Sequence, residues 1–305
     1  MRLGVFWILL GLVGLAAWLV WEKRAPRQQA LPRSQAERAP IELTDTSPEG
    51  AALSGPAKPH VGGPSAPSTQ GGLEAFYAQA PGCQVVRHRY YALCYDEEAE
   101  QARWTVYVLE GKRLEQGRLR RTQDFRPDPA VATASAQLQD YARSGYDRGH
   151  LVPAGDFKWD AQGLSETFYL SNMSPQLHEF NAGIWEAVES TVRSWARQKG
   201  RLVVYTGPVL GKPLGFIGQS RVAVPRAFYK VVYALEGETP TEAVGFLVPH
   251  RPTRRSPMEF LVPVDSVERE TGVDFWPALP DPLEARLERR VDKSFWRAAA
   301  SRRRR

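Results

Sequence analysis

A stretch in the middle of the chain constrains the fold most, because it places a histidine, a short apolar segment and a helix with one apolar face in succession. His150 follows a glycine and precedes an apolar run, which places its ring on a strand beside a core. Residues 168–172 are interpreted as a second short strand. Residues 181–198 carry apolar side chains at intervals of three and four, which predicts an amphipathic helix. We therefore expect a strand–strand–helix unit that directs His150 and Asn181 toward one point.

Alternating aromatic and β-branched residues predict further strands on both sides of this unit. These strands are expected at residues 104–108, 201–205, 228–233 and 244–248. Few helical patterns lie between them. The predicted fold class is therefore α+β, with a mixed sheet as the core of one domain over residues 73–292.

The N-terminal quarter of the chain differs in composition from the rest. Residues 3–21 contain no charged side chain and nearly reach the length of about 20 residues that crosses a bilayer, so we predict a transmembrane anchor over residues 1–24. A cleavable signal peptide is the alternative. Residues 25–72 are rich in Pro, Ala, Ser and Gly, which is typical of a disordered, flexible linker. Residues 293–305 end in four arginines and are predicted to form a solvated basic tail.

The charge and the cysteines narrow the functional classes only a little. The formal net charge of +6 favours an anionic partner such as nucleic acid or an anionic lipid surface, but a solvated basic surface explains it as well. Cys83 and Cys94 are the only cysteines, and two thiols without histidines at finger spacing exclude a zinc-finger cage. A disulfide between them and two unpaired thiols are both compatible with the sequence.

Several common catalytic motifs are incomplete in this chain. Residues 207–213 resemble a phosphate-binding loop, but they are one position short and lack the Ser or Thr after the lysine. His178 and Glu179 begin a zinc-protease motif in which Ala182 replaces the second histidine. A Gly-x-Ser-x-Gly segment, which would carry a nucleophilic serine, does not occur.

The polar residues of the predicted helix allow two interpretations. In a regular helix, Glu189 lies about 80° around the axis from Asn181, and Arg193 lies about 40° further. Asn181 then begins the helix on its core-facing side, bordered by a carboxylate and a guanidinium. Such a group can bind a metal ion and a phosphate, but an N-cap followed by a solvated helix edge has the same spacing.

Three signatures that decide between these interpretations occur in order along the chain. They are Asp-Arg-Gly-His at residues 147–150, Leu-Ser-Asn-x-x-Pro-Gln at residues 170–176, and Asn-x-x-x-Trp-x-x-x-Glu-x-x-x-Arg at residues 181–193. With these signatures the chain resembles the DNA/RNA non-specific endonuclease family, the ββα-metal nucleases. The resemblance covers most of residues 80–282. It implies a ββα-metal finger and a metal-dependent nuclease that cuts DNA and RNA without sequence preference.

The resemblance also implies roles for the polar residues of the finger. His150 would be the general base that takes a proton from the attacking water, a task suited to a neutral imidazole. Asn181 would be the one direct protein ligand of Mg²⁺, and Mn²⁺ would accept the same oxygen ligands. Asp147 and Glu189 would hold water molecules of the ion's hydration shell.

Further residues would bind or orient the phosphate. Arg148 and Arg193 would hold it with their guanidinium groups. Asn172 would orient either the general base or the scissile phosphate. The family also has an arginine upstream of the first signature, for which Arg126 is our choice and Arg121 the competitor.

The partners follow from these roles. DNA and RNA would be bound through the phosphate backbone, so we expect cleavage that is independent of sequence and sensitive to salt. Related nucleases often dimerise, and a homodimer is a further expectation. Two alternatives remain open: a catalytically idle module that only binds nucleic acid, and a phosphodiesterase of the same fold that acts on small nucleotides.

We infer the location of the protein from two features, the apolar N-terminal segment and the expected nuclease activity. Lys23, Arg24, Arg27 and Arg33 favour a cytoplasmic C-terminal side by the positive-inside rule. A nuclease free in the cytoplasm would threaten its own cell, however. We therefore expect a single-pass, membrane-anchored protein whose nuclease domain lies outside the cytoplasm, in the periplasm if the source is bacterial.

Overall fold

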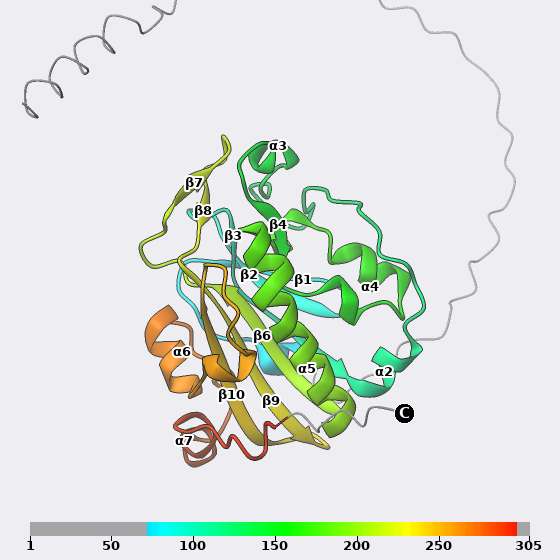
Figure 1. Ribbon diagram of the computed structural model, residues 1–305, viewed down its shortest axis with the longest axis vertical. Helices are drawn as coiled ribbons and strands as arrows, with labels where there is room; N and C mark the ends of the chain where they lie inside the picture. The colour runs from blue at the N-terminus through cyan, green and yellow to red at the C-terminus, as the bar shows by residue number, and fades with distance from the viewer. Residues whose placement is uncertain (1–71, 298–305) are drawn as a thin grey trace, which may run out of the picture. The chain divides into compact units, whose positions relative to one another are not determined.

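The computed structural model describes residues 72–297 (Figure 1). The predicted membrane anchor, the predicted linker up to residue 71 and the last eight residues of the predicted basic tail lie outside this part of the chain. Among the helices of residues 72–297, none combines the length and the hydrophobicity that crossing a bilayer requires.

The main sheet of the described residues has seven strands in the order β1-β2-β3-β6-β9-β10-β11, and all neighbouring strands pair antiparallel. The predicted α+β class is confirmed, but the sheet is antiparallel and not mixed. The four predicted strands lie within β3, β6, β9 and β10. The strands of the sheet are β1 (Gln84–Arg87), β2 (Tyr91–Asp96), β3 (Gln101–Glu110), β6 (Arg201–Pro208), β9 (Ala227–Glu236), β10 (Thr239–Pro249) and β11 (Leu261–Val262).

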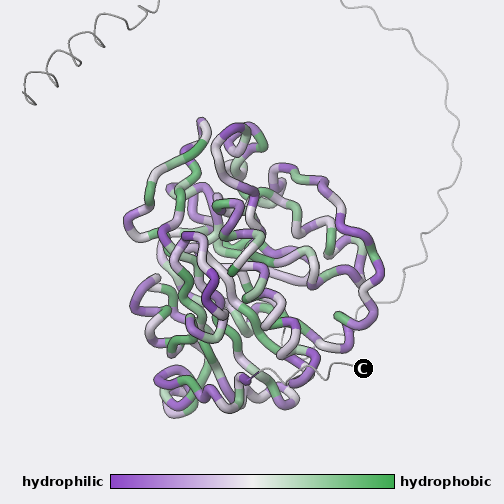
Figure 2. Tube along the Cα trace, viewed as in Figure 1, coloured by the Kyte–Doolittle hydropathy of each residue, from purple (hydrophilic) through white to green (hydrophobic). Residues whose placement is uncertain are grey.

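Helices cover both faces of this sheet. Alternate residues along β6 point to opposite faces, so Val204 belongs to the core beneath helix α5 while Val203 and Tyr205 belong to the core beneath α6 and α7. Figure 2 shows the hydrophobic stretches concentrated along the central strands. These helices are α5 (Glu186–Lys199), α6 (Val264–Thr271) and α7 (Asp281–Glu288).

A disulfide joins the second strand of the sheet, β2, to the segment that precedes β1. Cys83 and Cys94 form a disulfide with a Cα–Cα distance of 5.4 Å, which settles the alternative that the sequence left open. Cys94 lies in β2 opposite Val85 of β1, so the bond connects the residue before β1 to the neighbouring strand.

The predicted strand–strand–helix unit is present, with two differences from the expectation. β4 (Asp147–His150) pairs antiparallel with β5 (Met173–Gln176), so the second strand begins after residues 168–172. Residues 170–172 form the 3-10 helix η3 (Leu170–Asn172), because buried Leu170 anchors a tight turn that the backbone N–H of Met173 closes. The predicted helix also does not begin as a regular α-helix. Its first turn is the π-helical segment η4 (Phe180–Trp185), where Gly183 departs from helical backbone angles.

The remaining elements are short and surround the finger and the ends of the sheet. They are η1 (Leu73–Phe76), α2 (Gly111–Gln116), α3 (Leu138–Tyr141), η2 (Ala154–Asp156), α4 (Ala161–Glu166), η5 (Pro257–Phe260), and the hairpin of β7 (Gly215–Ile217) and β8 (Val222–Val224).

Candidate active site

The first strand of the finger places its aspartate beside the start of the helix. Asp147 Oδ2 accepts a hydrogen bond from Asn181 Nδ2 at 2.9 Å and lies 2.9 Å from His178 Nδ1. Asn181 is not the N-cap, because it lies one residue inside η4. Its amide nitrogen is held by Asp147, while its amide oxygen accepts no hydrogen bond within residues 72–297. Asn181 therefore has the free oxygen that a hard divalent cation requires.

A glycine permits the close pairing of the two finger strands. A Cβ atom at Gly149 would collide with the side chain of Gln176, which lies in the neighbouring strand. Because glycine has no Cβ, β4 can approach β5 closely one residue before His150. The intact glycine of the signature thus has a steric explanation in the fold.

His150 is buried at the end of β4. Its side chain packs edge-to-face on Phe168, with ring centroids 4.9 Å apart, and its Nε2 atom has no hydrogen-bond partner among the described residues. Burial, followed by the positive charges of Arg121 and Arg148, lowers the pKa of His150 to about 3. The imidazole is therefore neutral near neutral pH, which is the state that a general base needs.

This burial gives a direct prediction for the ionisation of His150. We expect the imidazole to stay neutral between about pH 8 and pH 5, because its lowered pKa lies below this interval. The unfolded chain binds this proton near pH 6.5, so the stability that the neutral ring contributes is lost as pH falls from about 6.5 toward 3. NMR titration of the ring carbons, assigned by their loss in His150→Ala, measures the ionisation. An inflection near pH 6.5 would contradict the buried position.

One cleft of about 660 Å³ contains both His150 and Asn181. Glu189 and Arg193 of α5 also line it, and so does His178. A second hollow of about 440 Å³ shares Arg121 and Asn181 with the first. The finger therefore brings the predicted base and the predicted metal ligand to one solvent-accessible space.

Comparisons with known proteins agree with this geometry. Residues 70–282 match the DNA/RNA non-specific endonuclease family. The chain belongs to this family. Endonuclease G of Bos taurus is 35% identical over 228 residues, which cover 70% of this chain and 76% of that protein. The EXOG nuclease of Danio rerio is 38% identical over 204 residues, which cover 62% of this chain and 60% of that protein.

A solved structure supports the same assignment. The crystal structure of the EndoG/EndoGI complex, which concerns the inhibition of EndoG, aligns with a TM-score of 0.63 and 29% sequence identity. The alignment covers 68% of this chain and 91% of the solved chain. The predicted membership of the non-specific endonuclease family is thus confirmed, and the relatives support the predicted nuclease activity.

The predicted location of this family member is wrong. Its relatives in Homo sapiens, Danio rerio and Schizosaccharomyces pombe are named as mitochondrial nucleases. These names contradict the predicted single-pass, membrane-anchored location. The expectation depended on the apolar length of residues 3–21, and length alone does not separate a permanent anchor from a targeting segment.

The arginines of this endonuclease are not equally placed for binding a phosphate. Arg148 is exposed and stacks over Phe125 at 4.3 Å from the ring centroid. Arg121 lines both hollows beside His150. Arg126 lines neither hollow, because its guanidinium is bonded to the side chain of Asp124 at 2.9 Å. The geometry favours Arg121, the competitor, as the upstream arginine.

Arg193 is held among carboxylates. Its guanidinium lies 3.3 Å from Asp156, 3.4 Å from Glu186 and 3.7 Å from Glu189, and only 16% of the side chain is exposed. This arrangement favours a role in fixing the Glu189 carboxylate over a direct contact with a phosphate. Burial raises the pKa of Glu189, which the neighbouring positive charges of Lys230 and Arg193 oppose.

The side chain of Asn172 is hydrogen-bonded to the backbone of the loop that follows His150. It is completely buried, accepts a hydrogen bond from Val152 N at 2.9 Å, and donates to the carbonyls of Val152 and Thr167. All three partners are backbone atoms. The side chain therefore holds the loop after β4 against the segment before β5.

Three residues near the site were missed by the sequence analysis. His178 was considered only as part of an incomplete zinc motif, yet it contacts Asp147. Asp156 accepts a hydrogen bond from Tyr107 and pairs with Arg193. Lys230 is completely buried in β9. The sequence could have indicated this burial. In a strand, a lysine that lies two residues from both Phe228 and Val232 points to the same face as these apolar side chains.

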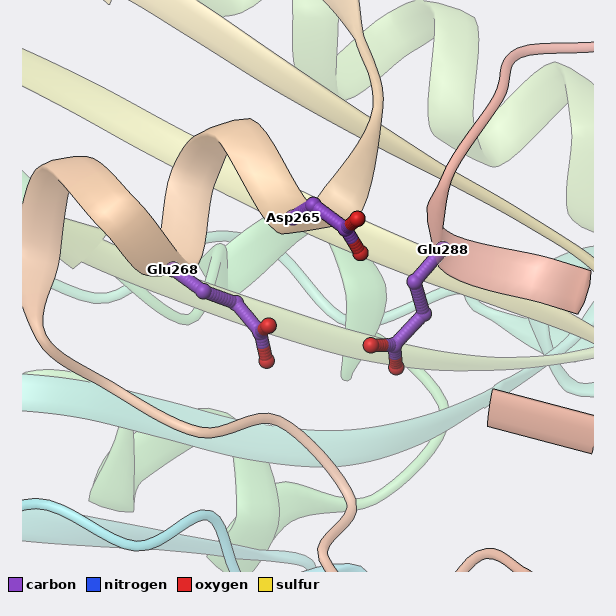
Figure 3. Close-up of side chains that lie close together, drawn as sticks. All are labelled: Asp265, Glu268 and Glu288. Carbon is purple, nitrogen blue, oxygen red and sulfur yellow. The ribbon is translucent and has the colours of Figure 1, made fainter. Parts of the chain in front are cut away.

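A cluster of three carboxyl groups outside the cleft can form without a bound metal ion. Asp265, Glu268 and Glu288 place oxygen atoms within 4.8 Å of one another (Figure 3). Glu288 accepts a hydrogen bond from Tyr233, which faces the core beneath α6, so the cluster lies on the sheet face opposite α5. Burial raises the pKa of Glu268 to about 7 and that of Glu288 to about 8. Because Glu268 and Glu288 retain protons up to near-neutral pH, these carboxyl groups can approach one another without a cation.

Proposed function

We propose that this chain is a metal-dependent endonuclease that hydrolyses phosphodiester bonds of DNA and RNA without sequence preference, through a catalytic unit over residues 73–292. The observation that carries the proposal is the shared cleft, in which a buried neutral His150 and the free amide oxygen of Asn181 line one space. Family membership supplies the class of substrate.

The residues present fit a hard divalent cation. Asn181 offers an unpaired amide oxygen, and the carboxylates of Asp147 and Glu189 offer negative charge nearby. Oxygen donors of this kind suit Mg²⁺, and Mn²⁺ accepts the same set. A bound cation would supply stabilisation of negative charge on the phosphate and on the leaving oxygen.

The protein's own groups would do the rest of the chemistry. His150 would take a proton from the water that attacks phosphorus. Arg121 and Arg148 would bind phosphate oxygens, and the negative charge of the phosphate would offset their effect on the pKa of His150. Asn172 would keep His150 in place through the backbone of the following loop. None of these groups reads a base edge, which accounts for the expected lack of sequence preference.

A substrate comparison tests the function. Wild-type protein should nick supercoiled plasmid and degrade long RNA with Mg²⁺ or Mn²⁺, and chelation should stop both reactions. Binding without cleavage under all these conditions would favour the idle module. Rapid hydrolysis of a dinucleotide ester with no attack on either polymer would favour the small-nucleotide phosphodiesterase.

A binding measurement tests the metal ligand separately from activity. Asn181→Ala should weaken Mn²⁺ binding by roughly tenfold to a hundredfold, because a site with one protein oxygen loses its direct contact. Electron paramagnetic resonance of free Mn²⁺ gives this affinity without turnover. Arg126→Gln is the matched control, since Arg126 lies outside both hollows. Equal Mn²⁺ affinity in Asn181→Ala and wild type would show that the cation binds elsewhere.

A further inference from the structure

The cleft extends well beyond the groups that the proposed chemistry uses. Glu186, Glu189, Arg193 and Arg197 of α5 all line it. Their spacing of three, four and four residues places them on one face of the helix, and Arg197 lies about 12 Å along the axis from Glu189. The C-terminal half of α5 therefore forms a wall of the cleft that leads away from His150.

A second cation lies near this end of the cleft, because α2 packs on Arg197 at Gly111 and Lys158 packs on Gly117, the residue after α2. Lys158 lines the cleft, and its backbone carbonyl accepts hydrogen bonds from Arg118 N and Leu119 N, each at 3.0 Å. A Cβ atom at Gly117 would lie 2.9 Å from the Cβ of Lys158, so glycine permits this close approach. The backbone of Lys158 is thus fixed at the rim before any ligand arrives.

The two cations at this end lack anionic partners. Lys158 and Arg197 are both exposed, and within residues 72–297 neither side chain makes a hydrogen bond or an ion pair. Arg193, four residues before Arg197, pairs with three carboxylates. The charge balance therefore changes along the cleft, from compensated near Glu189 to positive near Arg197. Uncompensated positive charge within a cleft attracts polyanions.

We propose that Lys158 and Arg197 form a second phosphate-binding site, which holds a phosphodiester of the substrate strand away from the bond that is cut. The distance of about 12 Å along α5 from Glu189 to Arg197 is longer than the separation of neighbouring phosphates on one strand, so the second site would hold a phosphate other than the one that is cut. Leu114 and Trp159 line the same end and offer apolar surface to the intervening sugars. The inference rests on the proposed nuclease function and makes strand length a determinant of affinity.

The test compares charge removal inside and outside the cleft. Full-length chains carry His150→Ala, which slows cleavage, together with Lys158→Gln, Arg197→Gln or the control Arg254→Gln. Arg254 is exposed, makes no hydrogen bond or ion pair in the described part of the chain, and does not line the cleft. Fluorescence anisotropy with a labelled dinucleotide and a long DNA oligonucleotide gives the affinities.

Each cleft variant should bind the long oligonucleotide about threefold to fivefold more weakly, while the dinucleotide affinity stays unchanged. Each should also reduce the affinity lost between low and moderate salt by roughly threefold, because one phosphate contact fewer displaces fewer counterions. In the cleavage-competent chain, the same variants should raise KM for long substrates and leave kcat unchanged.

The outcomes separate this inference from the proposed function. If wild type cleaves polymers but both cleft variants match Arg254→Gln, the second site is wrong and the nuclease stands. If wild type cleaves nothing but the cleft variants lose affinity only for the long strand, the second site stands and the nuclease is wrong. Equal losses for the dinucleotide and the long strand would overturn the second site, because Arg197 or Lys158 would then act at the scissile phosphate.

Discussion

His150→Ala should lower kcat/KM for plasmid cleavage by about 10²-fold to 10⁴-fold, the usual contribution of a positioned general base. The expected loss follows from the surroundings of the His150 side chain. His150 is the histidine of the signature, it is neutral because of its burial, and its Nε2 atom has no partner within residues 72–297. Steady-state cleavage of fluorescently labelled duplex, with Mg²⁺ in excess, measures the loss.

Two controls separate lost chemistry from lost structure. The substitution removes a ring that packs on Phe168 and Phe125, so the thermal midpoint of each variant has to be recorded. Free imidazole should restore part of the activity of His150→Ala, because it can enter the vacated space from the cleft and accept the proton. Activity within a factor of a few of wild type, at unchanged stability, would remove His150 from the mechanism.

The elements that the sequence predicted well are those whose side chains have a regular period. Residues 201–205 and 228–233 alternate or run continuously apolar, and both lie in central strands of the sheet. The second finger strand was misplaced by a few residues, because Phe168 and Leu170 are both buried although the chain turns between them and β5. A buried turn contains the same apolar residues as a buried strand, so the sequence alone does not distinguish the two.

The angles around the predicted helix could not be obtained from residue spacing. Counting about 100° per residue from Asn181 to Glu189 assumes one uninterrupted α-helix. The chain instead passes through the π-helical η4, and Gly183 leaves helical backbone angles. Asn181 is fixed by Asp147 of strand β4, and this tertiary contact cannot be obtained by counting residues along the helix.

The competing upstream arginines illustrate a second limit. Arg121 and Arg126 lie five residues apart in a segment without a period, so our choice of Arg126 rested on a loose alignment with the family and not on a structural pattern. The two arginines lie in different surroundings because each contacts residues that are distant in the sequence. Arg126 is held by Ser165 as well as Asp124, whereas Arg121 lies near His150 and over Phe168.

Removing the ammonium group of Lys230 should destabilise the domain by about 1 to 3 kcal/mol at pH 7, because it leaves the buried Thr206 hydroxyl without its donor and removes one of the two positive charges near Glu189. Lys230 is completely buried, and its Nζ donates to Thr206 Oγ1 at 2.5 Å. Burial lowers its pKa, while Glu189 and Asp156 oppose that shift. In Lys230→Met, the free energy of unfolding from urea titrations should fall by this amount.

The dependence on pH identifies the carboxylate responsible. Burial already raises the pKa of Glu189, and loss of the Lys230 charge raises it further. A carboxyl group whose folded pKa is raised contributes stability at low pH and loses it as pH rises. The pKa of Glu189 is about 7 in the wild type, so the part of the Lys230→Met deficit that comes from Glu189 should be small at about pH 5 and larger at about pH 8. Adding Glu189→Gln should remove this pH-dependent part of the deficit, since position 189 then carries no ionisable group and Arg193 still pairs with Asp156. A deficit that is equal at both pH values and unaffected by Glu189→Gln would mean that Lys230 stabilises the fold through its contacts with Thr206 and Trp185 alone.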